Sequence, residues 1–220
     1  MCEITITLNF EEIKKVLSSS QSLSKDVDVE YDLPRKLIDE YWDKNLRTVS
    51  DVATLFLIAW NNAAFRYGGF KPDKLKGWVE ENRDRIDGFR KREITSLNEN
   101  DKKCIKEMYE TLATCILKTK KRQFIAAAKT LHILAPSFFP VWDNKVAEGL
   151  RFRGIDADNY VKFCVALKDV LERERENVEK LKKWYYKEFE STRFIYGYSQ
   201  RTILKILDEY FYLKFTRGVV

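Results

Sequence analysis

A lysine, a histidine and an aspartate with side chains capable of catalysis lie close together in the middle of the sequence. They are Lys129, His132 and Asp143, within the segment KTLHILAPSFFPVWDN. A lysine whose pKa is lowered by burial acts as an amine nucleophile. Histidine transfers protons near neutral pH, and a carboxylate acts as an acid or base or stabilises positive charge. We therefore treat these three residues as a candidate catalytic group.

The elements around this segment predict how the three side chains are positioned. Apolar residues recur every three or four positions over residues 123–135, which predicts a helix with a buried face. Pro136 ends that helix because proline lacks the backbone N–H and restricts the residue before it. Asp143 is then expected to cap the next helix. Lys129 and His132 are three residues apart and share a helix face, so the loop is expected to bring all three residues to one corner.

Each of these residues also has a non-catalytic interpretation, which the sequence leaves open. A lone histidine on a helix is typically a hydrogen-bonded, partly buried residue. A lysine in an alanine-rich helix typically extends its ammonium group to solvent. An aspartate at a helix start often does no more than accept hydrogen bonds from the first turn.

Three groups of basic residues predict contacts with the phosphates of a nucleic acid. One group directly precedes the central helix, where free N–H groups and positive side chains suit an anion. The net charge of +6 and the pI of about 9.0 permit such binding without requiring it. Ordinary solvated surface is the alternative interpretation. The candidate nucleic-acid contacts are Lys118, Lys120, Arg122, Arg90, Lys91, Arg92, Arg151 and Arg153.

The composition predicts an all-α protein. Hydrophobic residues make up 45% of the 220 residues and charged residues 34%, whereas there are only 8 glycines and 4 prolines. Few turn-forming residues and many Lys, Glu, Leu and Ile favour helices over sheets. We expect about nine helices in one domain, 1–220, with an N-terminal arm and short helix at 1–25. The rest is expected to form either one body or two helical lobes, 26–117 and 118–220.

Residues 156–189 predict one long C-terminal helix. Apolar side chains there alternate steps of three and four residues, as in the seam of a coiled coil, and Glu174 interrupts them. A helix of this length would span about 50 Å at 1.5 Å per residue. It would either pack along the rest of the chain or form the interface of a homodimer.

The cysteines and the apolar stretches indicate the environment of the protein. The four cysteines show no C-x-x-C pair and no metal-ligand spacing, so we expect no metal, no cofactor and free thiols in a reducing cytoplasm. The most apolar stretch, residues 52–65, is too short to cross a membrane, and no membrane association is expected. The sequence lacks the motifs of phosphate-binding loops, dinucleotide-binding folds, zinc proteases and serine hydrolases.

The run KTLHILAPSFFPVWD resembles an element of a prokaryotic all-helical family, with its lysine, Leu-His, proline, Phe-Pro and Trp-Asp. That resemblance implies no activity. More distantly, the layout is similar to the helix–hairpin–helix DNA glycosylase superfamily, whose members are all-helical and two-lobed. In that superfamily a basic hairpin precedes a helix, and a catalytic aspartate begins the following helix.

This second resemblance implies a DNA-binding repair protein with base-excision chemistry. Asp143 matches the catalytic aspartate, Lys121 matches the hairpin lysine that attacks the sugar C1′ in bifunctional members, and Lys129 lies further into the helix. The sequence departs from the family in two places, since LKTKKR replaces the L-P-G-V-G type hairpin and W-D-N replaces V-D-T-H. The alternative is a non-catalytic helical structural or interaction protein in which the KxLH…WD element only stabilises the fold.

Overall fold

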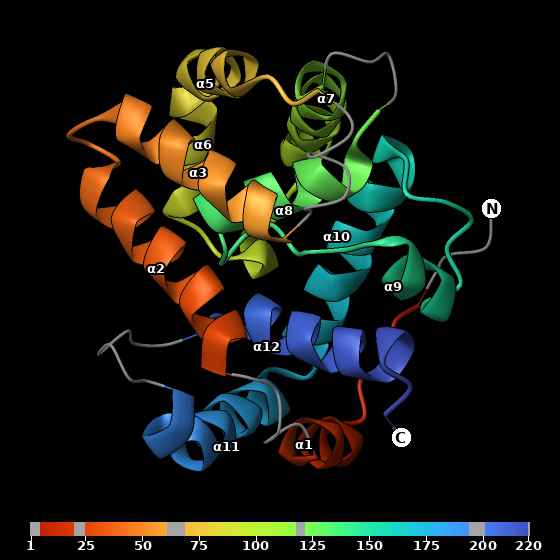
Figure 1. Cartoon of the computed structure of the whole chain (residues 1–220). Coiled ribbons are helices and arrows are strands. Elements are labelled where there is room, and N and C mark those ends of the chain that lie inside the picture. The colour runs from red at the N-terminus through yellow and green to blue at the C-terminus, as the bar shows by residue number, and fades with distance from the viewer. Residues whose placement is uncertain (1–4, 20–24, 61–68, 118–121, 194–200, 220) are drawn as a thin grey trace.

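The computed structural model describes residues 5–19, 25–60, 69–117, 122–193 and 201–219 (Figure 1). These residues form eleven α-helices, one 3-10 helix and one π-helix, and they contain no β-strand. The predicted all-α class is therefore confirmed. The number of α-helices exceeds the nine expected because Asn82 divides residues 72–88, which the sequence predicts as one helix, and Glu174 divides residues 156–189.

The first part of the chain forms the left and upper sides of the molecule in Figure 1, with α1 at the bottom. Asn9 caps α1, since its side-chain oxygen accepts a hydrogen bond from the N–H of Glu12 at 3.1 Å. Asn82 separates α5 from α6, and its side-chain amide donates to the carbonyl oxygen of Trp78 at 2.9 Å, a local alternative to helical bonding. The helices are α1 (Phe10–Ser18), α2 (Lys25–Tyr41), α3 (Leu46–Trp60), α5 (Pro72–Glu81) and α6 (Arg83–Arg90).

The second part of the chain supplies the centre, the right side and the lower side of the molecule in Figure 1. A capping box formed by Asn98 and Asp101 begins α7. The central helix α8 ends at Leu134, just before Pro136, as the sequence predicts. The elements are η1 (Ile94–Ser96), α7 (Glu99–Cys115), α8 (Phe124–Leu134), α9 (Asn144–Gly149), α10 (Ala157–Arg173), α11 (Arg175–Arg193), α12 (Ile203–Phe211) and η2 (Tyr212–Thr216).

The predicted single long C-terminal helix is wrong, because the chain bends at Glu174 between α10 and α11. Helix α10 packs against α7 and η1, whereas α11 packs against α1 and α2. A straight helix of this length would carry its second half away from the core. The bend at the one acidic position of the apolar seam lets each half bury its own stripe. The six apolar seam residues are buried within the single chain: Cys164, Leu167, Leu171, Val178, Leu181 and Tyr185.

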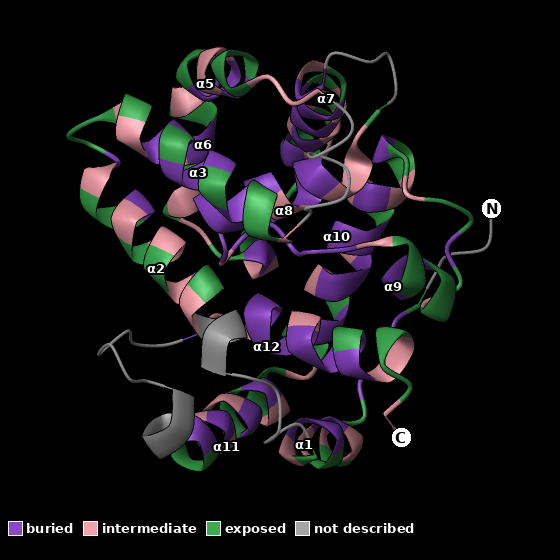
Figure 2. Ribbon diagram, in the orientation of Figure 1, coloured by how far each residue is buried: buried purple, intermediate pink, exposed green. Residues whose placement is uncertain are grey.

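Helix α8 lies at the centre of the core, in contact with α2, α3 and α7 (Figures 1 and 2). One hydrophobic cluster extends from Ile6 near the N-terminus to Leu213 in η2. The loop after α8 crosses this core, as its apolar sequence predicts, and Phe138, Phe139 and Trp142 are fully buried there. The core therefore surrounds the helix and the loop that carry the candidate catalytic group.

Candidate functional site

Both ring nitrogens of His132 form hydrogen bonds in the core. Nδ1 lies 2.7 Å from the carbonyl oxygen of Phe139, so Nδ1 carries the proton and donates it. Nε2 is then the acceptor, and the phenol O–H of Tyr31 in α2 donates to it at 2.9 Å. Complete burial lowers the pKa of His132 to about 4. The imidazole is thus neutral at neutral pH, and it joins α2 to the loop after α8.

Lys129, one turn before His132 on α8, lies in an environment that disfavours its positively charged form. Its ammonium group donates to the carbonyl oxygen of Trp60, the last residue of α3, at 2.7 Å. This is the one acceptor that the described residues provide for the three N–H bonds of the group. Burial lowers the pKa of Lys129; the charges of two carboxylates oppose the shift, and the positive charge of Lys205 adds to it. Lys129 therefore has the environment of an amine that can lose its proton.

A second lysine, Lys205 of α12, is buried beside the first. Its Nζ lies 4.7 Å from the ring centroid of Trp60 and 4.9 Å from that of Tyr31. Carboxylate oxygens of Asp208 and Glu209, on the same helix, lie 2.7 and 3.8 Å from it. Two ammonium groups thus lie near one indole ring. We define the amine cluster as Tyr31, Trp60, Lys129, His132 and Lys205.

Sequence reasoning missed Tyr31, Trp60 and Lys205, because they come from α2, α3 and α12 and lie far from α8 along the chain. One signal was available for Lys205. It forms i,i+3 and i,i+4 pairs with two acids inside the apolar run ILKILDEYF, and charges placed there are buried only as mutual partners.

Asp143 caps α9, as the sequence predicts. Its Oδ1 accepts a hydrogen bond from the backbone N–H of Val146 at 2.9 Å, and the residue is partly buried. Its negative charge raises the pKa of Lys129, in opposition to the effect of burial. Among the described residues, no hydrogen bond or ion pair joins the carboxylate to Lys129 or His132. The three predicted residues thus share one region, without direct contact between the aspartate and the other two.

Two of the predicted phosphate contacts are engaged inside the protein. Arg90 donates to the carbonyl oxygen of Leu134 at 2.5 Å and to Asp39 at 2.6 Å, and its guanidinium lies 4.4 Å from the ring centroid of Trp42. Arg92 donates to both carboxylate oxygens of Asp101 at 2.8 and 2.7 Å. These contacts hold α6 and the start of α7 in place, so both guanidinium groups are committed to structural partners.

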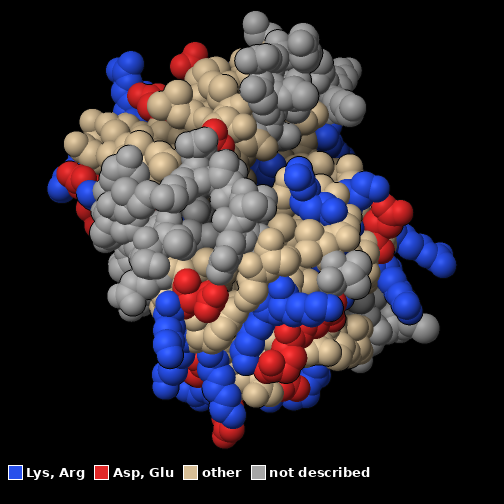
Figure 3. Space-filling model, turned by 60° about the horizontal axis from the view of Figure 1, so that its bottom comes forward, with Lys and Arg blue, Asp and Glu red and all other residues tan. Residues whose placement is uncertain are grey.

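The other predicted basic contacts are either exposed or lie outside the described residues. Lys91 is exposed and forms an ion pair with Asp87. On the face shown in Figure 3, basic and acidic side chains lie interspersed. Among the predicted contacts, the exposed arginines are Arg122, Arg151 and Arg153. The predicted residues outside the described part of the chain are Lys118, Lys120 and Lys121.

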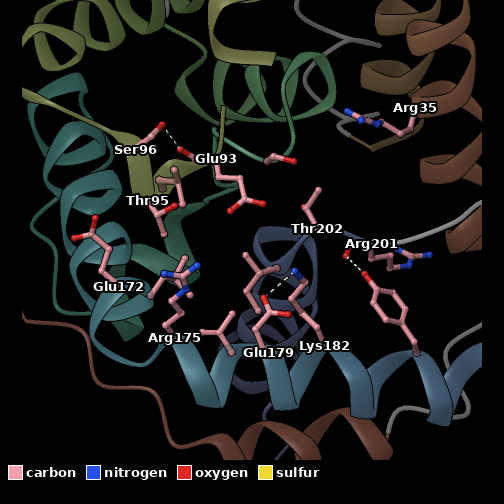
Figure 4. A pocket seen from close by; sticks show the side chains of 16 residues that line it. Arg35, Glu93, Thr95, Ser96, Glu172, Arg175, Glu179, Lys182, Arg201 and Thr202 are labelled. Carbon is pink, nitrogen blue, oxygen red and sulfur yellow. Dashed lines mark hydrogen bonds and ion pairs between the residues drawn. The ribbon is translucent and has the colours of Figure 1, made fainter. Parts of the chain in front are cut away.

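A cleft of about 690 Å³ opens between α11, η1 and the start of α12 (Figure 4). We call it the α11 cleft. Its charged lining includes basic residues from three helices or their ends, Arg35, Arg175, Lys182 and Arg201. Its acidic lining residues are Glu93, Glu172 and Glu179. The cleft therefore presents both signs of charge.

Arg201 lies between the α11 cleft and the amine cluster. Its side chain is only 2% exposed, and its guanidinium donates to Glu209 at 2.7 Å and to Asp32 at 3.3 Å. The guanidinium carbon lies 5.5 Å from the ring centroid of Tyr31. This arginine therefore belongs to the wall that separates the two regions.

The described residues contain no helix long and apolar enough to cross a membrane. Within the same residues, no group of three His, Cys, Asp or Glu side chains is arranged to hold a metal ion. The chain matches no protein family model, no curated protein and no solved structure. We therefore infer the function from the geometry of this chain.

Proposed function

We propose that the protein binds DNA and acts on it with base-excision chemistry of the glycosylase type, using Lys129 as an amine nucleophile. The observation that carries this proposal is the environment of Lys129. Its ammonium group is largely buried beside a second lysine, and both effects lower its pKa. Desolvation and a neighbouring cation are the conditions under which a lysine becomes nucleophilic.

In this chemistry Lys129 forms the covalent bond and Asp143 stabilises positive charge. The neutral amine of Lys129 attacks C1′ of the sugar, and a C–N bond forms as the glycosidic bond breaks. The departing base takes the bonding electrons and one proton from Nζ. The C1′–O4′ bond then breaks, O4′ takes the second proton from Nζ, and an imine between Nζ and C1′ remains. The carboxylate of Asp143, whose Oδ1 accepts from Val146 and whose Oδ2 has no hydrogen bond to the described residues, stabilises the positive charge that develops on the sugar. His132 is a positioning residue, because its nitrogens are occupied by Tyr31 and Phe139.

The imine provides the experiment. A DNA duplex with one abasic site is incubated with the protein and sodium borohydride, which reduces an imine to a stable amine and leaves a covalent complex. We expect the wild-type chain to form this complex and Lys129→Arg, which lacks a primary amine, to lose it. Lys145→Arg is the matched control, since Lys145 is exposed on α9. Absence of a complex, or an equal yield from Lys129→Arg, would contradict the proposal.

DNA binding is measured separately from the imine. The exposed arginines Arg122, Arg151 and Arg153 remain as phosphate contacts, whereas Arg90 and Arg92 are committed inside the protein. Replacement of Arg151 and Arg153 by glutamate is expected to weaken binding and to reduce its dependence on salt. No retention of the wild-type chain on duplex DNA at low salt would contradict the nucleic-acid assignment.

A non-catalytic helical protein is the second candidate, and one observation favours it. Lys129, His132 and Asp143 each direct a polar atom to a backbone group, at Trp60, Phe139 and Val146. In that case the KxLH…WD element joins α3, α8 and α9 and has no chemical task. The two candidates differ in the borohydride experiment, because only the first forms a covalent complex.

A further inference from the structure

We propose that the α11 cleft binds an extended segment of a partner protein that carries one cationic and one anionic side chain. The cleft uses different residues from those assigned to the chemistry of Lys129. Peptide binding in the α11 cleft therefore goes beyond the proposed function and is tested independently of it.

Two opposite charges in the cleft have no ion pair or hydrogen bond at their charged groups within the described part of the chain. One is Glu93, just before η1, and the other is Arg175, the first residue of α11. In Figure 4 the carboxylate of Glu93 projects into the cleft from one wall, and the side chain of Arg175 projects from the opposite wall. Two opposite charges that border one cavity match a ligand with the reverse pair of charges.

The other charges around the cleft already have partners. Lys182 pairs with Glu179 at 3.1 Å, and Glu172 pairs with Lys168 at 3.6 Å. Arg201 pairs with Glu209 at 2.7 Å, outside the cleft. Glu93 and Arg175 are therefore the groups through which the cleft selects the charges of a ligand.

The shape of the cleft fits an extended chain. Residues of α11 from Arg175 to Tyr186 line it, and at 1.5 Å per residue they span about 16 Å of the helix. About five residues of an extended peptide cover that length. The hydroxyl groups of Thr95 and Ser137 can bond a peptide backbone, whereas those of Ser96 and Thr202 already donate to carbonyl oxygens within the chain. Apolar floor residues that can contact its side chains are Ile94, Leu171, Val178 and Ile203.

The charges favour a peptide over a polyanion. Glu93, Glu172 and Glu179 line the same cavity and would each repel a phosphate. A nucleic-acid strand or an acidic lipid surface requires a predominantly basic contact. The volume of about 690 Å³ lies in the range of ordinary ligand sites.

The test uses three sets of acetylated, amidated peptides of Ser and Ala, and each set places two charged residues either two or four positions apart. One set carries a lysine and a glutamate, one carries two lysines, and one carries two glutamates. Binding to the full chain is followed by the NMR shifts of the backbone amides of Val178, Thr202 and Ile203. We expect the lysine–glutamate peptide to bind at least fivefold more tightly than the other two.

Charge reversal in the protein sharpens the test. Glu93→Lys should make the two-glutamate peptide the tightest ligand, and Arg175→Glu should make the two-lysine peptide the tightest. The control is the double variant K76E/E80K, which reverses an exposed ion pair on α5, and it should leave the order unchanged.

Several results would overturn the inference. They are no shift with any peptide, equal affinities for the three, or an order that neither charge reversal alters. Equal binding of 6-aminohexanoate would assign the cleft to small zwitterions, and shifts of the same amides by single-stranded DNA would assign it to nucleic acid. Each of these also contradicts a partner protein as the occupant.

Discussion

The amine cluster and the α11 cleft contain similar charged side chains in opposite circumstances. In the cluster, Lys205 is 3% exposed and lies within 4 Å of two carboxylates, and Lys129 is bonded to a carbonyl oxygen. In the cleft, Glu93 and Arg175 are exposed and unpaired within the described part of the chain. Burial therefore requires each charge to have a protein partner, whereas exposure leaves a charge available to a ligand.

The largest expected contrast comes from the same substitution at a buried and at an exposed arginine. Arg201→Met, in the wall between the two regions, should lower the free energy of unfolding by about 3–5 kcal/mol, because it removes the buried guanidinium that pairs with Glu209 and Asp32. Arg175→Met should change it by less than about 0.5 kcal/mol, because that side chain is exposed. Urea unfolding of the two variants measures the difference. Similar losses in both variants would contradict the difference drawn between buried and exposed charges.

The pH dependence of stability should come from the cluster. The pKa of His132 is about 4 in the folded chain, against 6.5 for an unperturbed histidine. The unfolded chain therefore binds the proton first, so the stabilisation is complete above pH 6.5 and declines as the pH falls toward 4. The difference amounts to about 3 kcal/mol at 1.36 kcal/mol per pKa unit.

Comparison with His132→Gln isolates this effect, because the variant keeps every carboxylate and lacks the only histidine. Unfolding free energies between pH 7 and pH 4 should decline less steeply in the variant than in the wild type. Parallel curves would show that His132 is not buried in its neutral form.

Substitutions of Asp143 have a smaller expected effect on stability, and they distinguish its role as a helix cap from its role in the chemistry. Asp143→Ala should cost about 1 kcal/mol of stability, because it removes the acceptor for the N–H of Val146. Asp143→Asn keeps an acceptor oxygen and should cost less, yet it removes the charge. Formation of the borohydride-trapped complex should decline in both variants. If the yield of trapped complex changes only with stability, and Asp143→Asn gives the same yield as the wild type, Asp143 serves only as a helix cap.

Local features of the fold followed from the sequence, and long-range features did not. The cap at Asp143 and the helix end before Pro136 depend on neighbouring residues, so the residue types were sufficient to predict them. The bend at Glu174 depends on where α1, α2, α7 and η1 lie, and the apolar pattern continues through it. A periodic pattern fixes which face is buried but not where the helix must turn.

The candidate site was predictable to the same limited extent. The shared face of Lys129 and His132 follows from their spacing, but their partners Trp60 and Tyr31 lie 69 and 101 residues away in sequence. Lys205 comes from a third helix. A run of basic residues also gives no sign that Arg90 donates to a carbonyl oxygen and to a carboxylate. Tertiary packing decides which charges are enclosed, and sequence spacing alone does not contain that information.

The titration of Lys129 tests the central claim most directly. The ε-carbon resonance of Lys129, assigned by its loss in Lys129→Arg, is followed by NMR as the pH is raised. We predict a midpoint below the ordinary lysine pKa of 10.5, because burial and the charge of Lys205 both disfavour the ammonium form. In Lys205→Met the midpoint should rise. A wild-type midpoint at or above 10.5 that Lys205→Met leaves unchanged would contradict the assignment of Lys129 as an amine nucleophile.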